Sequence, residues 1–215
     1  NILHLDLNKS LEYDRLTKKI MKMVITSTSN CIDVGCHKGE MLSHIVKLAP
    51  QGKHFGFEPI PSLYRQLKQK FSKAATILPY ALSDKKGTTT FNYVKNAPAY
   101  SGINKRTYEV ANPDIEEITV EMMRLDDCIL PGLPIFFIKI DVEGGELGVL
   151  KGAERIIKES KPIILFESGL GASDFYGTTS EDIFGFLSTQ YSMNIFTLKS
   201  WLSKGNPLDQ KEFSR

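Results

Sequence analysis

The sequence CIDVGCHKGE, residues 31–40, joins an apolar run to an acidic residue and then to two glycines four positions apart. Such a stretch is typical of the turn between a buried strand and a helix. Glycine suits this turn because the backbone must take a positive φ or approach a ligand closely, without a Cβ in the way. The spacing of Asp33, Gly35 and Gly39 leaves two interpretations open: a loop that holds a nucleotide-like cofactor, or simply a tight strand–helix turn.

On both sides of this stretch, apolar runs alternate with amphipathic segments. The apolar runs predict strands over residues 31–34, 53–57, 76–82, 135–140, 162–167 and 194–198. The amphipathic segments predict helices over residues 10–26, 39–49, 62–71 and 146–159, the last broken at 152, and around 183–187. This rhythm predicts an α/β fold with a mostly parallel central sheet and helices on both faces.

One region interrupts the rhythm. Residues 88–94 and 117–123 are β-rich with no helix of usable length between them, so residues 88–123 are predicted to form a hairpin-like insertion. Its connection, residues 95–116, is long for a compact domain and is typical of a substrate lid or of a mobile loop. Tyr100, Ser101 and Asn104 are therefore either substrate contacts or ordinary loop residues. The whole chain, 1–215, is expected to be a single domain that begins with a helical segment over 1–29.

The composition limits the classes of function. The 215 residues are 41% hydrophobic and 24% charged, which is ordinary for a globular protein, and a net charge of +2 does not indicate a nucleic-acid binder. No apolar run approaches the ~20 residues that cross a bilayer, and the opening residues carry no signal-peptide pattern. Three cysteines without CxxC spacing fit a reducing compartment. We expect a cytoplasmic protein with neither a nucleic-acid partner nor a membrane.

Glu58 adds to the cofactor interpretation. It ends the second predicted strand, 25 residues after Asp33, and an acidic residue there binds ribose hydroxyls in doubly wound folds. The alternative is a solvated carboxylate before a turn at Pro59. The G-x-G-x-x-G loop that cradles a pyrophosphate is absent, so the acidic loop favours a ligand that has a positive charge and no phosphate.

A third stretch identifies a family. FFIKIDVEGGELGVLKGA, residues 136–153, strongly resembles the central motif of the FkbM-family methyltransferases, which use S-adenosylmethionine. The resemblance runs from about residue 31 to about residue 198 and includes CIDVGCHKG at 31–39, FGFEP at 55–59 and PYALSD at 79–84. It implies a Rossmann-like class I methyltransferase fold, and methyl transfer to a hydroxyl oxygen of a small molecule or a glycan.

The resemblance also implies a cofactor site. The residues that would bind S-adenosylmethionine are Asp33, Gly35, Cys36, His37, Gly39, Glu58, Pro59, Ala81, Leu82 and Asp141. Among them, Asp33, Gly35 and Gly39 would face the methionine part, and Glu58 would hold the ribose. Ala81 and Leu82 would line the adenine, and Asp141 would lie beside the methionine or the reacting methyl group.

Asp141 and Glu143 are the candidate catalytic residues, because a general base would help a weak hydroxyl nucleophile. Both precede a predicted helix, so they could equally be caps that pin the strand–helix turn. With Glu146 they could also form a cation site, but no His or Asn falls nearby to complete an oxygen-rich set, so no metal is expected. His37 is either a base or a solvated loop residue. Glu167, after the fifth predicted strand, is a candidate substrate contact.

Two other functions stay open at this point. One is a protein that binds S-adenosylmethionine or a related nucleoside without catalysis, which would keep Glu58 and the glycines. The other is a nicotinamide-dependent oxidoreductase built on a similar sheet. The missing third glycine and pyrophosphate loop count against the oxidoreductase.

Overall fold

The computed structural model describes residues 2–105, 108, 110–167 and 176–214. The chain divides into two compact units, one formed by residues 27–179 and the other by residues 1–26 together with 180–215. The larger unit holds both sheets, and the described elements of the smaller unit are helical. Among the described residues, no helix is both long enough and apolar enough to cross a membrane.

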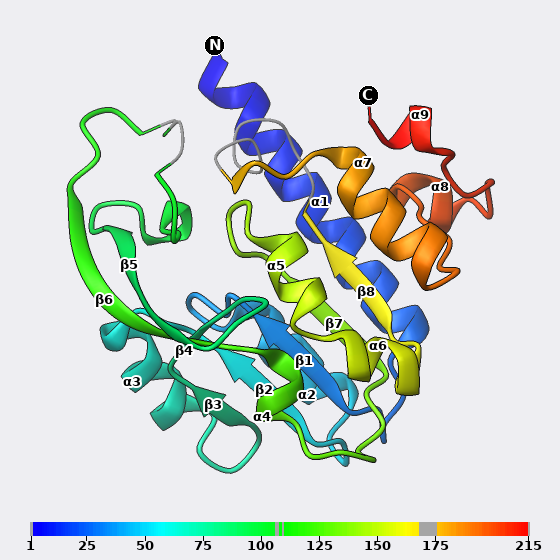
Figure 1. Cartoon of the computed structure of the whole chain (residues 1–215), viewed down its shortest axis with the longest axis horizontal. Coiled ribbons are helices and arrows are strands. Elements are labelled where there is room, and N and C mark those ends of the chain that lie inside the picture. Colours follow the sequence, from blue (N-terminus) through cyan, green and yellow to red (C-terminus); the bar gives the residue numbers. More distant parts are fainter. Residues whose placement is uncertain (1, 106–107, 109, 168–175, 215) are drawn as a thin grey trace. The chain divides into compact units, whose positions relative to one another are not determined.

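The central sheet has five parallel strands in the order β3-β2-β1-β7-β8 (Figure 1). Their bounds are β1 (Cys31–Val34), β2 (His54–Phe57), β3 (Thr76–Leu78), β7 (Phe137–Ile140) and β8 (Ile163–Phe166). The two middle strands, β1 and β7, are buried at every residue, as expected for parallel strands that are covered on both faces. The mostly parallel sheet predicted from the sequence is confirmed.

Helices connect these strands on both faces of the sheet. The connecting helices are α2 (Glu40–Leu48), α3 (Pro61–Lys70), α5 (Glu146–Lys151) and α6 (Glu154–Ser160), and the short α4 (Leu125–Cys128) precedes β7. The crossovers through α2 and α3 lead away from β1 in one direction, and those through α5 and α6 lead from β7 in the other. Because such crossovers are right-handed, the two pairs cover opposite faces, and Figure 1 shows α5 and α6 on the near face.

A second sheet of three strands forms the predicted insertion. Its order is β4-β6-β5, with bounds β4 (Tyr80–Leu82), β5 (Gly87–Val94) and β6 (Ile115–Met123). β5 and β6 pair antiparallel along the whole of β5, which confirms the hairpin-like insertion. The single strand predicted over 76–82 is wrong. Pro79 lacks an N–H group and separates β3, which joins the central sheet, from β4, which pairs parallel with β6.

The insertion packs against the start of α3. One apolar cluster joins its strands to the central fold through Ile60, Leu63, Ala81, Phe91, Val120 and Met122. The first part of the long connection folds back on β5 through a 3₁₀ turn over Pro98–Tyr100. Asn92 and Gly102 exchange backbone hydrogen bonds of 2.8 and 3.3 Å, which hold this part of the connection beside the strand. Residues 98–102 of the predicted lid are therefore held beside β5.

The smaller unit contains α1 (Ile2–Val24), α7 (Ser180–Phe184), a π-helical turn over Gly185–Gln190, α8 (Leu198–Leu202) and α9 (Gln210–Phe213). An ion pair of 3.0 Å between Lys199 and Glu12 joins α8 to α1. The strand predicted over 194–198 is wrong, because residues 194–197 are irregular and Thr197 caps α8 by accepting a hydrogen bond from the Ser200 N–H. Ile195 is buried, which accounts for the apolar residue in this run. Among the described residues of this unit, no strand pairs with it.

Two glycines allow the β1–α2 loop to fit against its neighbours. Gly35 has φ 78°, and a Cβ added there would collide with the backbone carbonyl of Asp141, at the end of β7. Gly39 has φ 72°, and its added Cβ would lie only 2.6 Å from carbon atoms of Leu67 and Phe71 on and after α3. Both positions therefore require glycine for packing as well as for backbone conformation.

We expect Gly35→Ala to lower the free energy of unfolding by about 2–4 kcal/mol, since backbone strain adds to a clash that no side chain can relieve. Gly132→Ala is the matched control, because Gly132 also has φ 78° but nothing lies within 4 Å of its added Cβ. That variant should lose only about 1 kcal/mol. Urea denaturation measures both, and equal losses would contradict the steric argument.

Candidate active site

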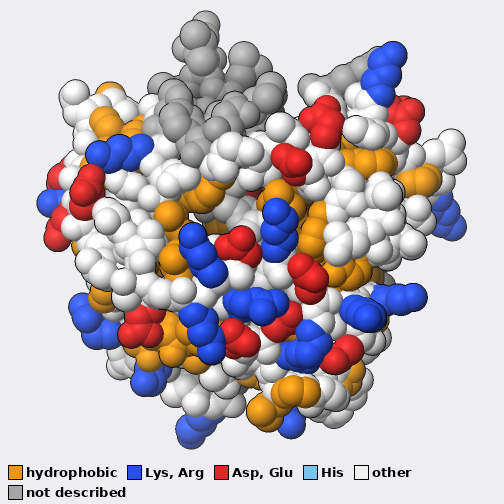
Figure 2. Space-filling model, in the orientation of Figure 1, with side chains coloured by type: hydrophobic (Ala, Val, Ile, Leu, Met, Phe, Trp, Pro, Cys, Tyr) orange, Lys and Arg blue, Asp and Glu red, His pale blue; other side chains and the backbone are white. Residues whose placement is uncertain are grey.

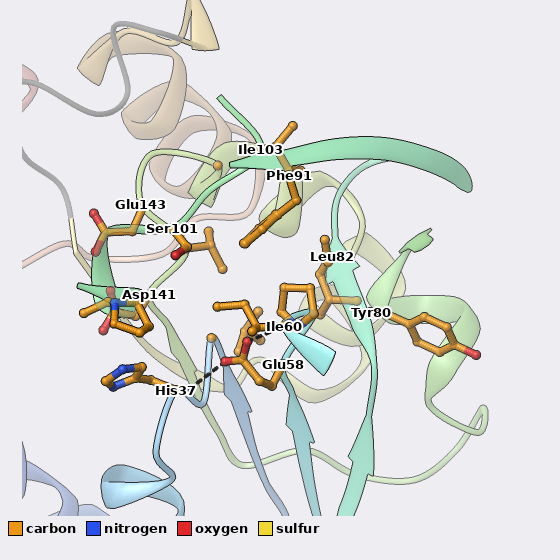
Figure 3. Close-up of a pocket in the computed structure, with 18 of the residues that line it drawn as sticks. His37, Glu58, Ile60, Tyr80, Leu82, Phe91, Ser101, Ile103, Asp141 and Glu143 are labelled. Carbon is orange, nitrogen blue, oxygen red and sulfur yellow. Dashed lines mark hydrogen bonds between the residues drawn. The ribbon is translucent and has the colours of Figure 1, made fainter. Parts of the chain in front are cut away.

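A cavity lies at the carboxyl ends of the parallel strands, the edge at which open α/β sheets bind ligands (Figure 3). Residues that follow four different strands line it: Gly35 after β1, Glu58 after β2, Asp141 after β7 and Glu167 after β8. The insertion closes another side with Phe91, Pro98, Ala99, Ser101 and Ile103. All the lining residues belong to the larger unit.

Glu58 ties the β1–α2 loop to the end of β2. Its Oε2 accepts a hydrogen bond of 2.8 Å from the His37 N–H, and its Oε1 accepts one of 2.9 Å from the Ile60 N–H (Figure 3). The side chain is buried, yet it lines the cavity. Burial raises the pKa of Glu58 to about 7, although the two N–H donors act in the opposite direction. Because a carboxylate has about four lone-pair sites, it can accept further hydrogen bonds from a ligand.

Three charged side chains lie on or directly after the two middle strands. Asp33 on β1 pairs in register with Lys139 on β7, and Asp141 follows Lys139 by two residues. The Lys139 Nζ lies 2.8 Å from Asp141 Oδ2 and 4.0 Å from Asp33 Oδ1. The side chain of Asp33 is 1% exposed and that of Asp141 is 37% exposed, so the group runs from the core to the cavity.

The electrostatics of this group follow from its burial. Desolvation raises the pKa of Asp33 to about 6, although the positive charge of Lys139 lowers it. Burial alone would lower the pKa of Lys139, but the charges of Asp141 and Asp33 outweigh burial and raise it. Lys139 therefore stays a cation at neutral pH. A lysine within an apolar run predicts either a sheet-edge position or a carboxylate partner, and the structure shows the carboxylate partner on a middle strand.

A strained turn connects β7 to α5. Glu143 has φ 59°, a left-handed conformation that is uncommon for a side-chain-bearing residue, and Gly144 follows with φ 105°. The buried carboxylate of Glu146 closes the turn, since its Oε1 accepts hydrogen bonds from the N–H groups of Gly144 (3.1 Å) and Val142 (3.4 Å). The turn thereby presents Asp141 and Glu143 to the cavity. Glu146 therefore stabilises the turn and does not line the cavity.

The insertion and the chain after β8 complete the wall. The Ser101 Oγ accepts a hydrogen bond of 3.0 Å from the Val94 N–H, which holds Ser101 in the cavity lining. The Tyr176 hydroxyl accepts one of 3.2 Å from the Asn104 N–H, and an added Cβ at Gly145 would lie 3.5 Å from the Tyr176 ring. Tyr176 thus bridges the insertion and the β7–α5 turn.

The structure brings most of the predicted site residues together. Those that line the cavity are Gly35, His37, Glu58, Pro59, Ala81, Leu82, Ser101, Asp141, Glu143 and Glu167. Burial and the nearby Lys38 lower the pKa of His37, so its ring is neutral at pH 7.

Five predicted residues do not line the cavity: Asp33, Cys36, Gly39, Tyr100 and Asn104. The Cys36 thiol turns inward and donates to the Asp33 carbonyl over 3.2 Å. Gly39 lies against α3, as described above. These two residues shape the loop from behind its ligand-facing side.

Several residues that line the cavity were not predicted from the sequence, above all Ile60, Phe91, Ile103 and Tyr176. Phe91 and Tyr93 are alternate residues of β5, and Tyr93 packs against the apolar cluster that contains Phe91, so an alternating aromatic pattern was the available signal. Tyr176 follows a glycine- and serine-rich stretch that carries no strand or helix signal.

The cavity has an apolar side and an acidic side. Figure 3 shows Leu82, Phe91 and Ile103 across from Asp141 and Glu143, with Glu58 between them. The described lining includes neither Lys nor Arg, although Figure 2 shows cationic and acidic side chains interspersed over one face of the molecule. The site can hold a flat apolar group on one side, hydroxyl groups at Glu58 and a positive charge near Asp141.

A parallel sheet of this order, a glycine-containing loop after its middle strand and an acidic residue after the next strand define a Rossmann-like nucleoside-binding class. The family model described as "Methyltransferase FkbM domain" matches residues 33–193. The chain therefore belongs to the FkbM methyltransferase family, as its sequence motifs indicated.

Individual relatives are more distant. Methyltransferase sdnD of Sordaria araneosa is 28% identical over 154 residues, which cover 57% of this chain and 60% of the relative, so the chain spans less than two thirds of that protein. Among solved structures, a proposed rRNA-methylase of Clostridium thermocellum has 12% identity and a TM-score of 0.46, over 80% of this chain and 76% of the other. A SAM-dependent methyltransferase of Aquifex aeolicus has 11% identity and a TM-score of 0.43, over 85% and 81%.

Removing the Glu146 side chain should loosen the β7–α5 turn. We expect Glu146→Ala to lower the free energy of unfolding by roughly 2–3 kcal/mol, because the buried N–H of Gly144 loses a charged acceptor. Glu146→Gln keeps an oxygen at the same place and should lose less than half as much. Chemical denaturation of both variants checks this, and equal losses would show that the hydrogen bonds do not hold the turn.

Proposed function

We propose that this chain transfers a methyl group from S-adenosylmethionine to a hydroxyl group of a small molecule or a glycan. Membership in the FkbM methyltransferase family supports the reaction class. The observation that carries the proposal is the buried Glu58 carboxylate, which faces the cavity beside an apolar wall. A nucleoside needs both features together, an acceptor for its ribose hydroxyls and an apolar surface for its base.

The residues present fit this cofactor. Ile60, Leu82 and Phe91 would contact the adenine, and Glu58 would accept hydrogen bonds from the ribose hydroxyls. Asp141 would lie at the methionine end, where its carboxylate attracts positive charge. When bound, the cofactor supplies an electrophilic methyl group on a sulfonium.

The chain itself contributes positioning and proton transfer. Asp141, which accepts a hydrogen bond from the ammonium group of Lys139, would accept the proton of an attacking hydroxyl at a carboxylate oxygen. Glu143 is the second candidate for this role, because the same turn presents it to the cavity. Ser101, Glu167 and Tyr176, which line the cavity beside the β7–α5 turn, would contact the acceptor.

Calorimetric titration of the purified protein with S-adenosylmethionine and S-adenosylhomocysteine tests the proposal first. Micromolar binding of both would support it, and a panel of hydroxyl compounds then tests for methyl transfer. Binding without turnover on a broad panel would favour a binding protein that lacks catalysis. Absence of binding at high concentration would overturn the cofactor assignment.

We expect Glu58→Ala to weaken adenosine binding by roughly 1–3 kcal/mol, because two ribose hydroxyls lose their acceptor in a closed site. The wild-type protein should bind adenosine more tightly as the pH rises from about 5.5 to 8. The pKa of about 7 means that Glu58 is protonated below this range and becomes a full acceptor as the pH passes through it. Calorimetry at each pH measures both effects.

The matched ligand is 2′,3′-dideoxyadenosine, which keeps the base but lacks both hydroxyls. Its affinity should be low, independent of pH and unchanged by Glu58→Ala. A similar pH response for the two nucleosides would remove Glu58 from ribose recognition.

Asp141→Asn should weaken S-adenosylmethionine binding about tenfold, because its carboxylate lies at the methionine end, and should lower the single-turnover rate by a larger factor, about a hundredfold or more, if Asp141 also acts on the acceptor as a general base. Single-turnover kinetics and calorimetry on the same variant separate the two quantities. Equal losses in binding and turnover would make Asp141 a cofactor ligand instead.

A further inference from the structure

The group of Asp33, Lys139 and Asp141 is an unusual feature for the middle of a sheet. In parallel strands, residues paired in register project to the same face, so Asp33 and Lys139 lie side by side. Residues two apart on a strand also share a face, which brings Asp141 to the same side. Both β1 and β7 are otherwise apolar and buried, so three charges on neighbouring strand ends need a reason.

Asp33 costs the fold free energy. Its side chain is 1% exposed, and neither carboxylate oxygen makes a hydrogen bond of good geometry among the described residues, although the Cys36 thiol and the Leu42 N–H both help to lower its pKa. The opposite charge beside it is the Lys139 ammonium at 4.0 Å. A well-packed apolar pair at these positions would be equally or more stable, since desolvation of a buried ion pair often exceeds the attraction.

Lys139 connects the core to the cavity. Its side chain is 11% exposed, and Nζ donates to Asp141 Oδ2 over 2.8 Å, so the short contact points toward the ligand side and the longer contact points into the core. Asp141 lines the cavity, whereas Asp33 and Lys139 do not. The buried Asp33 carboxylate restrains the ammonium group of Lys139 from the core side, and Lys139 in turn restrains Asp141.

We propose that Lys139 is a positioning residue that fixes the Asp141 carboxylate toward the methionine end of the cofactor, and that Asp33 supports Lys139 from the core without touching the ligand. This inference rests on the proposed use of S-adenosylmethionine. It assigns Asp33 a supporting role, in place of the direct cofactor contact expected from the sequence.

Positioning and simple electrostatics predict opposite results for Lys139→Met. Loss of the cation makes the site more negative, and long-range attraction alone would then strengthen binding of the positively charged S-adenosylmethionine. Loss of positioning lets the Asp141 carboxylate turn away and weakens binding. Adenosine is the matched ligand, because it occupies only the Glu58 side and has no methionine part.

The experiment measures dissociation constants for S-adenosylmethionine and adenosine by calorimetry. We expect Lys139→Met to weaken S-adenosylmethionine binding at least about tenfold while adenosine binding changes less than about twofold. Lys139→Arg, which keeps a cation that can reach a carboxylate, should restore most of the loss. Lys151→Met is the control, because Lys151 is an exposed lysine on α5 and its removal should change neither constant.

Two further variants keep the proposal testable where Lys139→Met folds poorly. Asp33→Asn together with Lys139→Met removes both buried charges and should still show the selective loss. Asp33→Asn alone should keep S-adenosylmethionine binding within about threefold, because the 2.8 Å contact to Asp141 remains. A loss with Asp33→Asn larger than with Lys139→Met would show that Asp33 acts on the ligand other than through Lys139.

The outcomes separate this inference from the proposed function. If the wild-type protein binds S-adenosylmethionine but Lys139→Met weakens both ligands equally or strengthens the first, the positioning role is overturned and the cofactor assignment stands. If the wild-type protein binds adenosine but not S-adenosylmethionine, both are overturned. A selective loss that Lys139→Arg restores establishes the positioning role.

Discussion

The pairing of β1 with β7 is the constraint on which the site depends. These strands form the middle of the parallel sheet, and their carboxyl ends approach so closely that only glycine fits at residue 35. The approach brings the loop after β1 and the turn after β7 to one side of the cavity. It also sets Asp33 beside Lys139, so one register determines both the backbone contact and the arrangement of charges.

Glu58 performs a comparable task between β1 and β2. Its two oxygens accept hydrogen bonds from the backbone N–H groups of His37 and Ile60, and both of these residues line the cavity. A carboxylate in this position shapes the site even before a ligand arrives, and burial keeps its pKa close to neutrality. A structural role and the proposed binding role are therefore combined in one side chain, which distinguishes Glu58 from Glu146, whose described hydrogen bonds serve the β7–α5 turn.

The sequence predicted the central fold well because apolar runs and glycine turns are local signals. The prediction failed where the structure of a segment depends on the other segments with which it pairs. The run over 76–82 reads as one strand, but the missing N–H of Pro79 lets its halves join different sheets. The run at 194–198 has strand-like residues, but Thr197 begins a helix there. The site was predicted in part for a similar reason: a motif such as CIDVGCHKG shows which residues are close in sequence and does not show which way each side chain points.

Pro79 connects the central sheet directly to the second sheet. A single residue separates β3, at the edge of the central sheet, from β4, which is hydrogen-bonded to the insertion. A short connection therefore joins the second sheet to the central sheet. At the other end of the insertion, the long stretch of residues 95–116 connects β5 to β6. Changes of length after Ile103, which packs on the apolar cluster around Ile60 and Phe91, would leave the apolar side of the cavity intact. Such a division keeps one wall of the cavity fixed while a single segment is free to change in length.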